Sequence, residues 1–80
     1  MDILKFESKE ALSREEAAAR LRAIADGLAS HNDVELDWGG KHVRIHVADE
    51  VRLELEIEVG EDETELEIEL KWSRSGGPRP

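Results

Sequence analysis

The sequence contains no cysteine and no tyrosine among its 80 residues, and its aromatic residues are one phenylalanine and two tryptophans. Without cysteine the chain can form no disulfide, thiolate nucleophile or cysteine-ligated zinc site, and this composition favours a reducing compartment. No segment approaches the run of about 18 apolar residues that a membrane span needs. The start, from Met1 to Lys5, also lacks the basic and apolar regions of a signal peptide. We therefore expect a cytoplasmic protein.

Positive charge is scarce in this sequence. It has 11 Lys and Arg residues against 20 Asp and Glu residues, which gives a formal net charge of −9. A protein that binds nucleic acid must present cations that displace counterions from phosphates, and an anionic membrane surface selects for the same charge. We therefore expect no direct binding to nucleic acid and no binding to membranes. Most of the excess lies in residues 48–72, which carry two basic and eleven acidic side chains.

The first part of the chain has the pattern of a short strand followed by a helix. Residues 4–8 alternate between charged and less polar side chains, which predicts a half-buried strand. Ser13 and Glu16 have the spacing of a capping box, in which each side chain binds the backbone N–H of the other residue. A helix over residues 14–30 is predicted by apolar residues at helical spacing, namely Ala17, Leu21, Ile24, Ala25 and Leu28.

Four segments of period two follow the predicted helix, over residues 33–38, 42–47, 51–59 and 64–72. Gly39-Gly40 supplies a tight turn between the first two of these segments. That turn places apolar residues opposite each other on one face and opposite charges on the other. The expected pairs are Leu36 with Val43 and Val34 with Ile45 on the apolar face, and Asp37 with His42, Glu35 with Arg44 and Asp33 with His46 on the polar face.

These elements predict an α+β domain over residues 1–72. We expect an antiparallel sheet of four to five strands, in the order β-α-β-β-β-β, with one helix packed on its apolar face. The strand over residues 4–8 is placed beside the last strand, because Lys5 and Lys9 would then face Glu67 and Glu69. Residues 73–80 include glycine, proline and arginine but no apolar pattern, and we expect them to form a disordered C-terminal tail.

The last two predicted strands carry glutamate on every second residue. A register that keeps the apolar face continuous puts glutamate opposite or diagonal to glutamate, which destabilises a sheet. One interpretation is a solvated outer face; the other is a surface kept acidic to meet a basic protein or a cation. The candidate binding residues on this face are Glu54, Glu56, Glu58, Glu65, Glu67 and Glu69.

Trp38 and Trp72 fall on the apolar side of their strands and are candidate residues of an apolar interface, although packing in the core is the alternative. A sheet of five strands is roughly 24 Å wide at its usual spacing, whereas a helix is about 10 Å in diameter. One helix leaves much of such a face uncovered. We therefore expect either a homodimer or a protein partner that covers the sheet.

Candidate catalytic and metal-binding residues are few. His42 and His46 are about 13 Å apart along one strand, and this distance is too large for one zinc ion, whose bonds to nitrogen are about 2 Å long. Gly39-Gly40 does not precede a helix, so it is no phosphate-binding loop, and no glutamate falls on an apolar face that would raise its pKa. We expect no enzyme activity, no metal and no cofactor.

These observations favour a non-catalytic protein-interaction module with an acidic sheet face. The alternatives are a structural or solubilising domain without a specific ligand, and an acidic inhibitor or antitoxin-like decoy of a basic nucleic-acid-binding protein. A decoy predicts binding that weakens with salt, whereas a structural domain predicts no stoichiometric partner.

The chain resembles the amphi-Trp domain family of small prokaryotic proteins, which is named for an amphipathic strand that ends in tryptophan. The matching segments are Phe6 to Ser8, Ser13 to Ala17, Leu21 to Leu28 and Glu65 to Trp72. Gly27 departs from the family pattern, which has a longer and usually charged residue there. The resemblance implies a domain of unknown function without an assigned activity, cofactor or catalytic residue, so it identifies no site residue.

Overall fold

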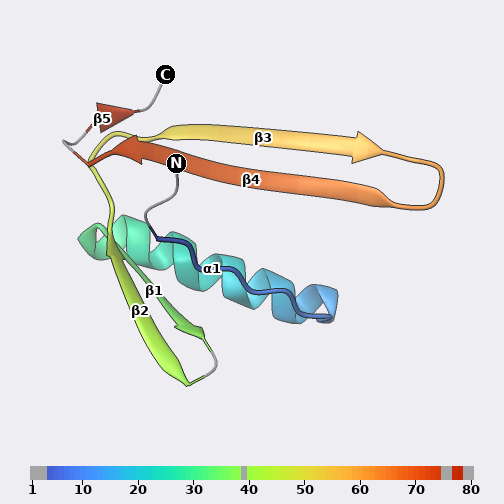
Figure 1. The fold of residues 1–80 in the computed structure, drawn as a ribbon, viewed down its shortest axis with the longest axis horizontal. Coiled ribbons are helices and arrows are strands. Elements are labelled where there is room, and N and C mark those ends of the chain that lie inside the picture. The colour runs from blue at the N-terminus through green and yellow to red at the C-terminus, as the bar shows by residue number, and fades with distance from the viewer. Residues whose placement is uncertain (1–3, 39, 75–76, 79–80) are drawn as a thin grey trace. The chain divides into compact units, whose positions relative to one another are not determined.

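The computed structural model describes residues 4–38, 40–74 and 77–78, and their side chains except those of Trp38, Gly77 and Pro78. The chain divides into two compact units, Met1–Ile45 and His46–Pro80. The described residues contain one α-helix and β-strands, which confirms the predicted α+β class (Figure 1).

The helix α1, Arg14–His31, belongs to the first unit and begins at the predicted capping box. The backbone N–H of Glu16 donates to Ser13 Oγ at 3.1 Å, and the backbone N–H of Ser13 donates to Glu16 Oε1 at 3.1 Å. The helix ends at Asn32, whose φ of 55° is in the left-handed region. Asparagine tolerates this conformation and commonly terminates helices. The helix predicted over residues 14–30 is therefore confirmed.

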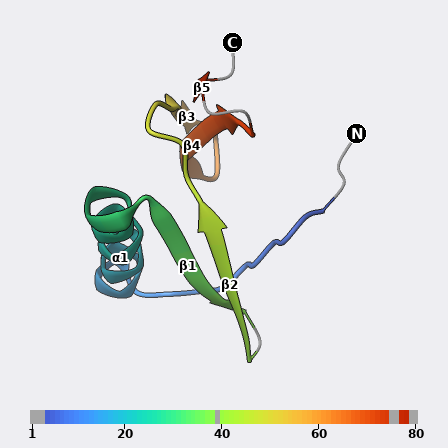
Figure 2. The same cartoon turned by 90° about the vertical axis from the view of Figure 1, so that its left-hand side faces the viewer.

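The strands β1, Asp33–Trp38, and β2, Lys41–His46, form a two-stranded sheet (Figure 2). Helix α1 packs against β1. Gly27 permits this approach, because a Cβ atom added there would lie 2.5 Å from the backbone oxygen of Asp33. Val34 and Leu36 of β1 are half-buried, as are Ile24 and Leu28 of the helix. The apolar side of α1 therefore packs within the first unit.

The predicted strand over residues 4–8 is wrong. Residues 4–13 form neither helix nor strand in the structure, so the β-α-β-β-β-β order and the predicted neighbours of this strand fail with it. Alternation shows which side chains share a face, but a strand also requires backbone pairing with a neighbour. The described part of this segment lacks that pairing and is tied to α1 instead by an ion pair between Glu10 and Arg20.

The second unit is a long hairpin of β3, Arg52–Val59, and β4, Thr64–Ser73, with a short strand β5, Gly77–Pro78, beside the end of β4 (Figure 1). The backbone N–H of Gly60 donates to the oxygen of Glu63 at 2.9 Å and closes the turn. The register places like residues opposite each other: Leu53 with Leu70, Leu55 with Ile68, Ile57 with Leu66, Glu54 with Glu69, Glu56 with Glu67 and Glu58 with Glu65. The predicted opposition of glutamates is therefore confirmed.

The predicted single sheet of four to five strands is not confirmed, because the strands pair as two sheets, β1–β2 and β3–β4–β5. Pairing within each hairpin follows from local turns and alternation, whereas pairing between hairpins depends on contacts that a periodic pattern does not encode. Val47, which follows β2 and is 3 % exposed, is the one buried hydrophobic residue in the described part of the chain.

The predicted disordered tail, residues 73–80, begins in β4 and includes β5, which pairs with Trp72 and Ser73. Residues 75, 76, 79 and 80 lie outside the described residues. The tail and the single domain over residues 1–72 therefore stay predictions. Within the described ranges, no helix combines the length and the apolar character that crossing a membrane requires.

Candidate functional site

All the glutamates predicted as binding residues lie together on one face of the β3–β4 hairpin. We call this the acidic face and define it as Glu54, Glu56, Glu58, Glu65, Glu67 and Glu69. The period of two in each strand brings the side chains to the same side, and the register places each one opposite another. Like charges directly opposite destabilise a hairpin, so this arrangement costs stability.

The centre of the acidic face concentrates the repulsion. The charges of Glu65 and Glu56 raise the pKa of Glu67, and Glu69 adds to the effect. Among the residues that the structure describes, no ion pair reaches Glu56, Glu58, Glu65 or Glu67. These glutamates are exposed and form the uncompensated part of the face.

The end of the acidic face near the start of β3 is neutralised by cations. Arg52 Nε lies 3.2 Å from Glu54 Oε1, and Lys71 Nζ lies 3.7 Å from Glu54 Oε2 and 3.4 Å from Glu69 Oε1. A hydrogen bond with Glu69 and the charge of Lys71 lower the pKa of Glu54. This difference between the two ends was not predicted from the sequence, although Arg52 and Lys71 share the alternate positions of the glutamates.

The opposite side of the hairpin is apolar and open to solvent. We call it the apolar face and define it as Leu53, Leu55, Ile57, Val59, Leu66 and Ile68, which are between 49 % and 75 % exposed. Trp72, a predicted interface residue, is half-buried at the end of this hairpin and is opposite Pro78 in the register. Trp38, the other one, is the last residue of β1, and its side chain lies outside the described residues.

The polar face of the β1–β2 sheet contains two of the three predicted ion pairs, His42 with Asp37 and Arg44 with Glu35, whereas Asp33, predicted opposite His46, contacts Arg44. His42 Nδ1 lies 2.9 Å from Asp37 Oδ1, and Arg44 Nη2 lies 2.6 Å from Asp33 Oδ2. Glu35 lies near both cations, 3.6 Å from His42 Nε2 and 3.7 Å from Arg44 Nε. The hydrogen bond with Asp37 and the charge of Glu35 raise the pKa of His42. In the described residues no group of three or more His, Asp or Glu side chains is arranged to hold a metal ion.

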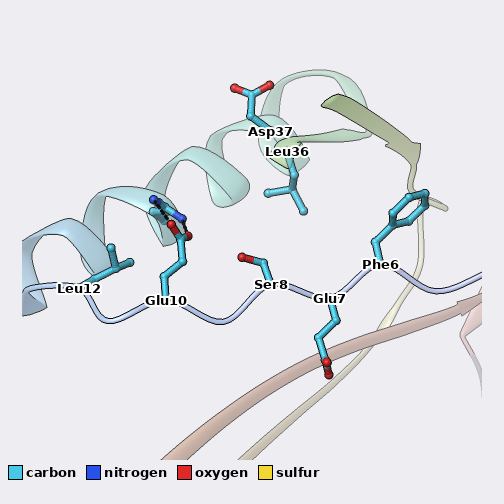
Figure 3. Close-up of a pocket in the computed structure, with 8 residues that line it drawn as sticks. Phe6, Glu7, Ser8, Glu10, Leu12, Leu36 and Asp37 are labelled. Atoms are coloured by element: carbon cyan, nitrogen blue, oxygen red, sulfur yellow. Dashed lines mark hydrogen bonds and ion pairs between the residues drawn. The ribbon is translucent and has the colours of Figure 1, made fainter. Parts of the chain in front are cut away.

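A hollow of about 510 Å³ lies in the first unit between the N-terminal segment, α1 and β1, and sequence reasoning did not identify it (Figure 3). Phe6, Leu12 and Leu36 supply its apolar lining, and the Glu10–Arg20 ion pair lies at its wall. The hydrogen bond and charge of Arg20 lower the pKa of Glu10. Among the described residues that line the hollow, Ser8 is the one with a hydroxyl group, and none is a histidine that could act as its base.

The family model of the Amphi-Trp domain matches residues 1–80, the whole chain. The chain belongs to the Amphi-Trp domain family. This confirms the resemblance seen in the sequence. The amphipathic strand that ends in tryptophan, for which the Amphi-Trp family is named, corresponds to β4 with Trp72 near its end.

The comparisons of this Amphi-Trp chain with other proteins add no further relative. None of the curated proteins and none of the solved structures compared with it gives a match. The departure from the Amphi-Trp pattern at Gly27 has a local explanation, because only glycine leaves room there for the backbone oxygen of Asp33.

Proposed function

We propose that this chain is a non-catalytic protein-interaction module whose acidic face binds a basic surface of another protein. The observation that carries the proposal is the register, which sets Glu56 opposite Glu67 and Glu58 opposite Glu65, with no cation from the described part of the chain beside them. A partner that supplies lysine or arginine side chains relieves this repulsion on binding. It is also attracted over distance by the acidic field, which raises the association rate.

A protein partner fits this surface better than a metal ion. Calcium takes six or more oxygen ligands that converge on one point, whereas side chains on one face of a hairpin stand roughly parallel to each other. The long row of carboxylates suits a row of cationic side chains instead. Nucleic acid is disfavoured as a direct ligand because the acidic face repels phosphate.

We place this function in the cytoplasm of a prokaryotic cell. The chain has no cysteine, which agrees with a reducing compartment, and it resembles a family of small prokaryotic proteins. Abundant basic proteins of that compartment, including those that bind nucleic acid, carry the complementary charge.

The test is capture of partners from a lysate of the source organism by three forms of the full chain. These are the wild type, a variant with Glu56, Glu58, Glu65 and Glu67 changed to Gln, and a control with matched loss of charge. The control changes carboxylates outside the acidic face: Glu50→Gln, Glu61→Gln, Asp62→Asn and Glu63→Gln.

The wild type and the control are expected to retain the same basic protein, and the acidic-face variant is expected to lose it. The captured protein should also dissociate as salt rises from about 0.1 M to 1 M, because the Debye length falls from about 10 Å to 3 Å. Equal capture by all three forms, or capture of no stoichiometric protein by the wild type, contradicts the proposal.

A further inference from the structure

The apolar face of the β3–β4 hairpin is large for a surface that remains in water. Its six aliphatic side chains are all exposed by about half or more. At roughly 100 Å² for each side chain they present about 600 Å² of apolar surface, which reaches the upper end of the largest patch on an ordinary monomer, about 300–600 Å². The largest patch on a monomer is often functional, and this one is continuous over two strands.

The helix of the same chain is a poor cover for this face. Helix α1 already packs against β1, and its residues Ile24 and Leu28 are half-buried in that unit. Leu21, which is 49 % exposed, is its one large aliphatic residue that remains open. One leucine cannot cover the aliphatic side chains of two strands, so α1 does not supply the cover.

We propose that the cover is a second copy of this chain, whose apolar face packs against the first. Together the two faces bury about 1,200 Å², the lower limit for a specific and stable interface of about 1,200–2,000 Å². Sheets that pack face to face lie about 10 Å apart, and in this arrangement both acidic faces point outward. They are then separated by more than the Debye length of about 8 Å at physiological salt, so their repulsion is screened.

The charges at the ends of the hairpin select an antiparallel arrangement of the two copies. The turn carries Glu61, Asp62 and Glu63, whereas the opposite end is neutralised, because Arg52 and Lys71 pair there with Glu54 and Glu69. A two-fold axis across the strands places the acidic turn of each copy near the neutralised end of the other. The alternative axis, along the hairpin, brings both acidic turns together, which like charges disfavour.

This arrangement predicts which residues meet across the interface. An axis that passes near Glu56 relates position 53 of one copy to position 59 of the other, because both are three residues from the centre. Leu53 and Val59 both belong to the apolar face, so each Leu53 should lie opposite the Val59 of the other copy. The inference does not depend on the proposed function, since the acidic face stays free on the outside.

The first experiment is the mass of the full chain in solution, by size exclusion with light scattering at about 10–200 µM, a range in which specific homodimers form. We expect twice the chain mass of 9.0 kDa for the wild type. The variant Leu55→Lys with Ile68→Lys should be monomeric. The control Glu56→Gln with Glu67→Gln changes the net charge by the same amount on the acidic face and should remain a dimer.

A monomeric wild type across that range overturns the proposal, and so does a variant with both lysines that still dimerises. Circular dichroism of each variant shows whether its secondary structure is intact. Cross-linking provides a second measurement that does not depend on a variant that disrupts the interface. The natural chain has no cysteine, so only the cysteines introduced for the experiment can react.

In this second experiment, chains with Leu53→Cys are mixed with chains that carry Val59→Cys and a mass tag, and the mixture is treated with a bifunctional maleimide whose reach matches the sheet separation of about 10 Å. A direct disulfide needs Cα atoms within about 7 Å of each other, so this longer linker is used, and the antiparallel dimer predicts a link mainly between one chain of each kind. Efficient cross-linking of the Val59→Cys chain to itself contradicts the antiparallel arrangement. Absence of any cross-link contradicts face-to-face packing.

Discussion

Glu56 of β3 lies directly opposite Glu67 of β4 in the middle of the acidic face, and no cation of the described residues lies within ion-pair distance of either carboxylate. The nearest compensation is at one end, where Arg52 and Lys71 contact Glu54 and Glu69. The hairpin is therefore neutralised at one end and repulsive in its centre. This asymmetry makes the electrostatic cost of the acidic face measurable at single positions.

The change Glu67→Gln should stabilise the chain, because it removes a charge that is repelled by Glu65 and Glu56. We expect a rise in Tm of about 1–5 °C at low ionic strength, measured by thermal unfolding with circular dichroism. The rise should shrink at 1 M salt as the repulsion is screened. Glu61→Gln in the turn removes the same charge without a glutamate opposite and should leave Tm nearly unchanged. A lower Tm for Glu67→Gln would show that its carboxylate makes a stabilising contact.

The two ends of the acidic face should also titrate differently. The pKa of Glu54 is lowered by the hydrogen bond with Glu69 and the charge of Lys71, whereas that of Glu67 is raised by Glu65 and Glu56. Carboxyl carbon-13 NMR should therefore place Glu54 below and Glu67 above the ordinary glutamate pKa of about 4.3. Identical titration of the two groups would mean that the hairpin register is not formed in solution.

These shifts give opposite contributions to stability as the pH falls. Glu67 binds its proton more tightly in the folded chain, so its protonation in the window between its raised pKa and the ordinary value stabilises the fold. Glu54 contributes stability above the ordinary value, and this is lost as the pH falls through its lowered pKa. Urea unfolding should show a shallow rise in stability on mild acidification, followed by a loss. Glu67→Gln should abolish the rise and keep the loss.

The features that could be predicted from sequence are those fixed by neighbouring residues. The two residues of the capping box, Ser13 and Glu16, are three positions apart, and the opposition of Glu54 and Glu69 follows from alternation on either side of a short turn. The strand over residues 4–8 had no such local partner to fix it. Its alternation was real, but in the structure the N-terminal segment contacts α1 through the charge pair of Glu10 and Arg20.

The candidate site divides in the same way. Alternate positions in each strand are enough to predict which glutamates form the acidic face. The same alternation could have predicted that Arg52 and Lys71 neutralise Glu54. We expected part of the apolar face to remain uncovered by the helix. How much of it is exposed depends on whether the two hairpins join into one sheet. That step is set by contacts far apart in the sequence, which periodicity does not describe.

His42 offers a test of the first unit. Its pKa is raised by the hydrogen bond with Asp37 and by the charge of Glu35, so its protonated form stabilises the fold below the ordinary histidine pKa. This contribution is lost as the pH rises through the raised pKa. Asp37→Asn should lower the pKa of His42, measured by proton NMR of the imidazole ring. Glu15→Gln in the first turn of α1 removes an equal charge and should not change it. An unchanged pKa in Asp37→Asn would show that the two side chains do not interact in solution.

Gly27 should resist replacement, although it lies inside a helix where alanine is intrinsically better by about 1 kcal/mol. A Cβ atom at this position would lie 2.5 Å from the backbone oxygen of Asp33, and a backbone atom cannot move aside as a flexible side chain could. Helix α1 would then have to move away from β1. We expect Gly27→Ala to destabilise the chain by about 1–2 kcal/mol after the gain in helix propensity is included.

The matched control for Gly27→Ala is Gly60→Ala in the turn of the second unit. There the added Cβ atom lies 3.4 Å from the oxygen of Glu63, an ordinary contact, so stability should stay within about 0.5 kcal/mol of the wild type or rise slightly. Urea unfolding of both variants measures the difference. If Gly27→Ala proved as stable as Gly60→Ala, the close packing of α1 on the start of β1 would be contradicted, and helix propensity alone would govern this position.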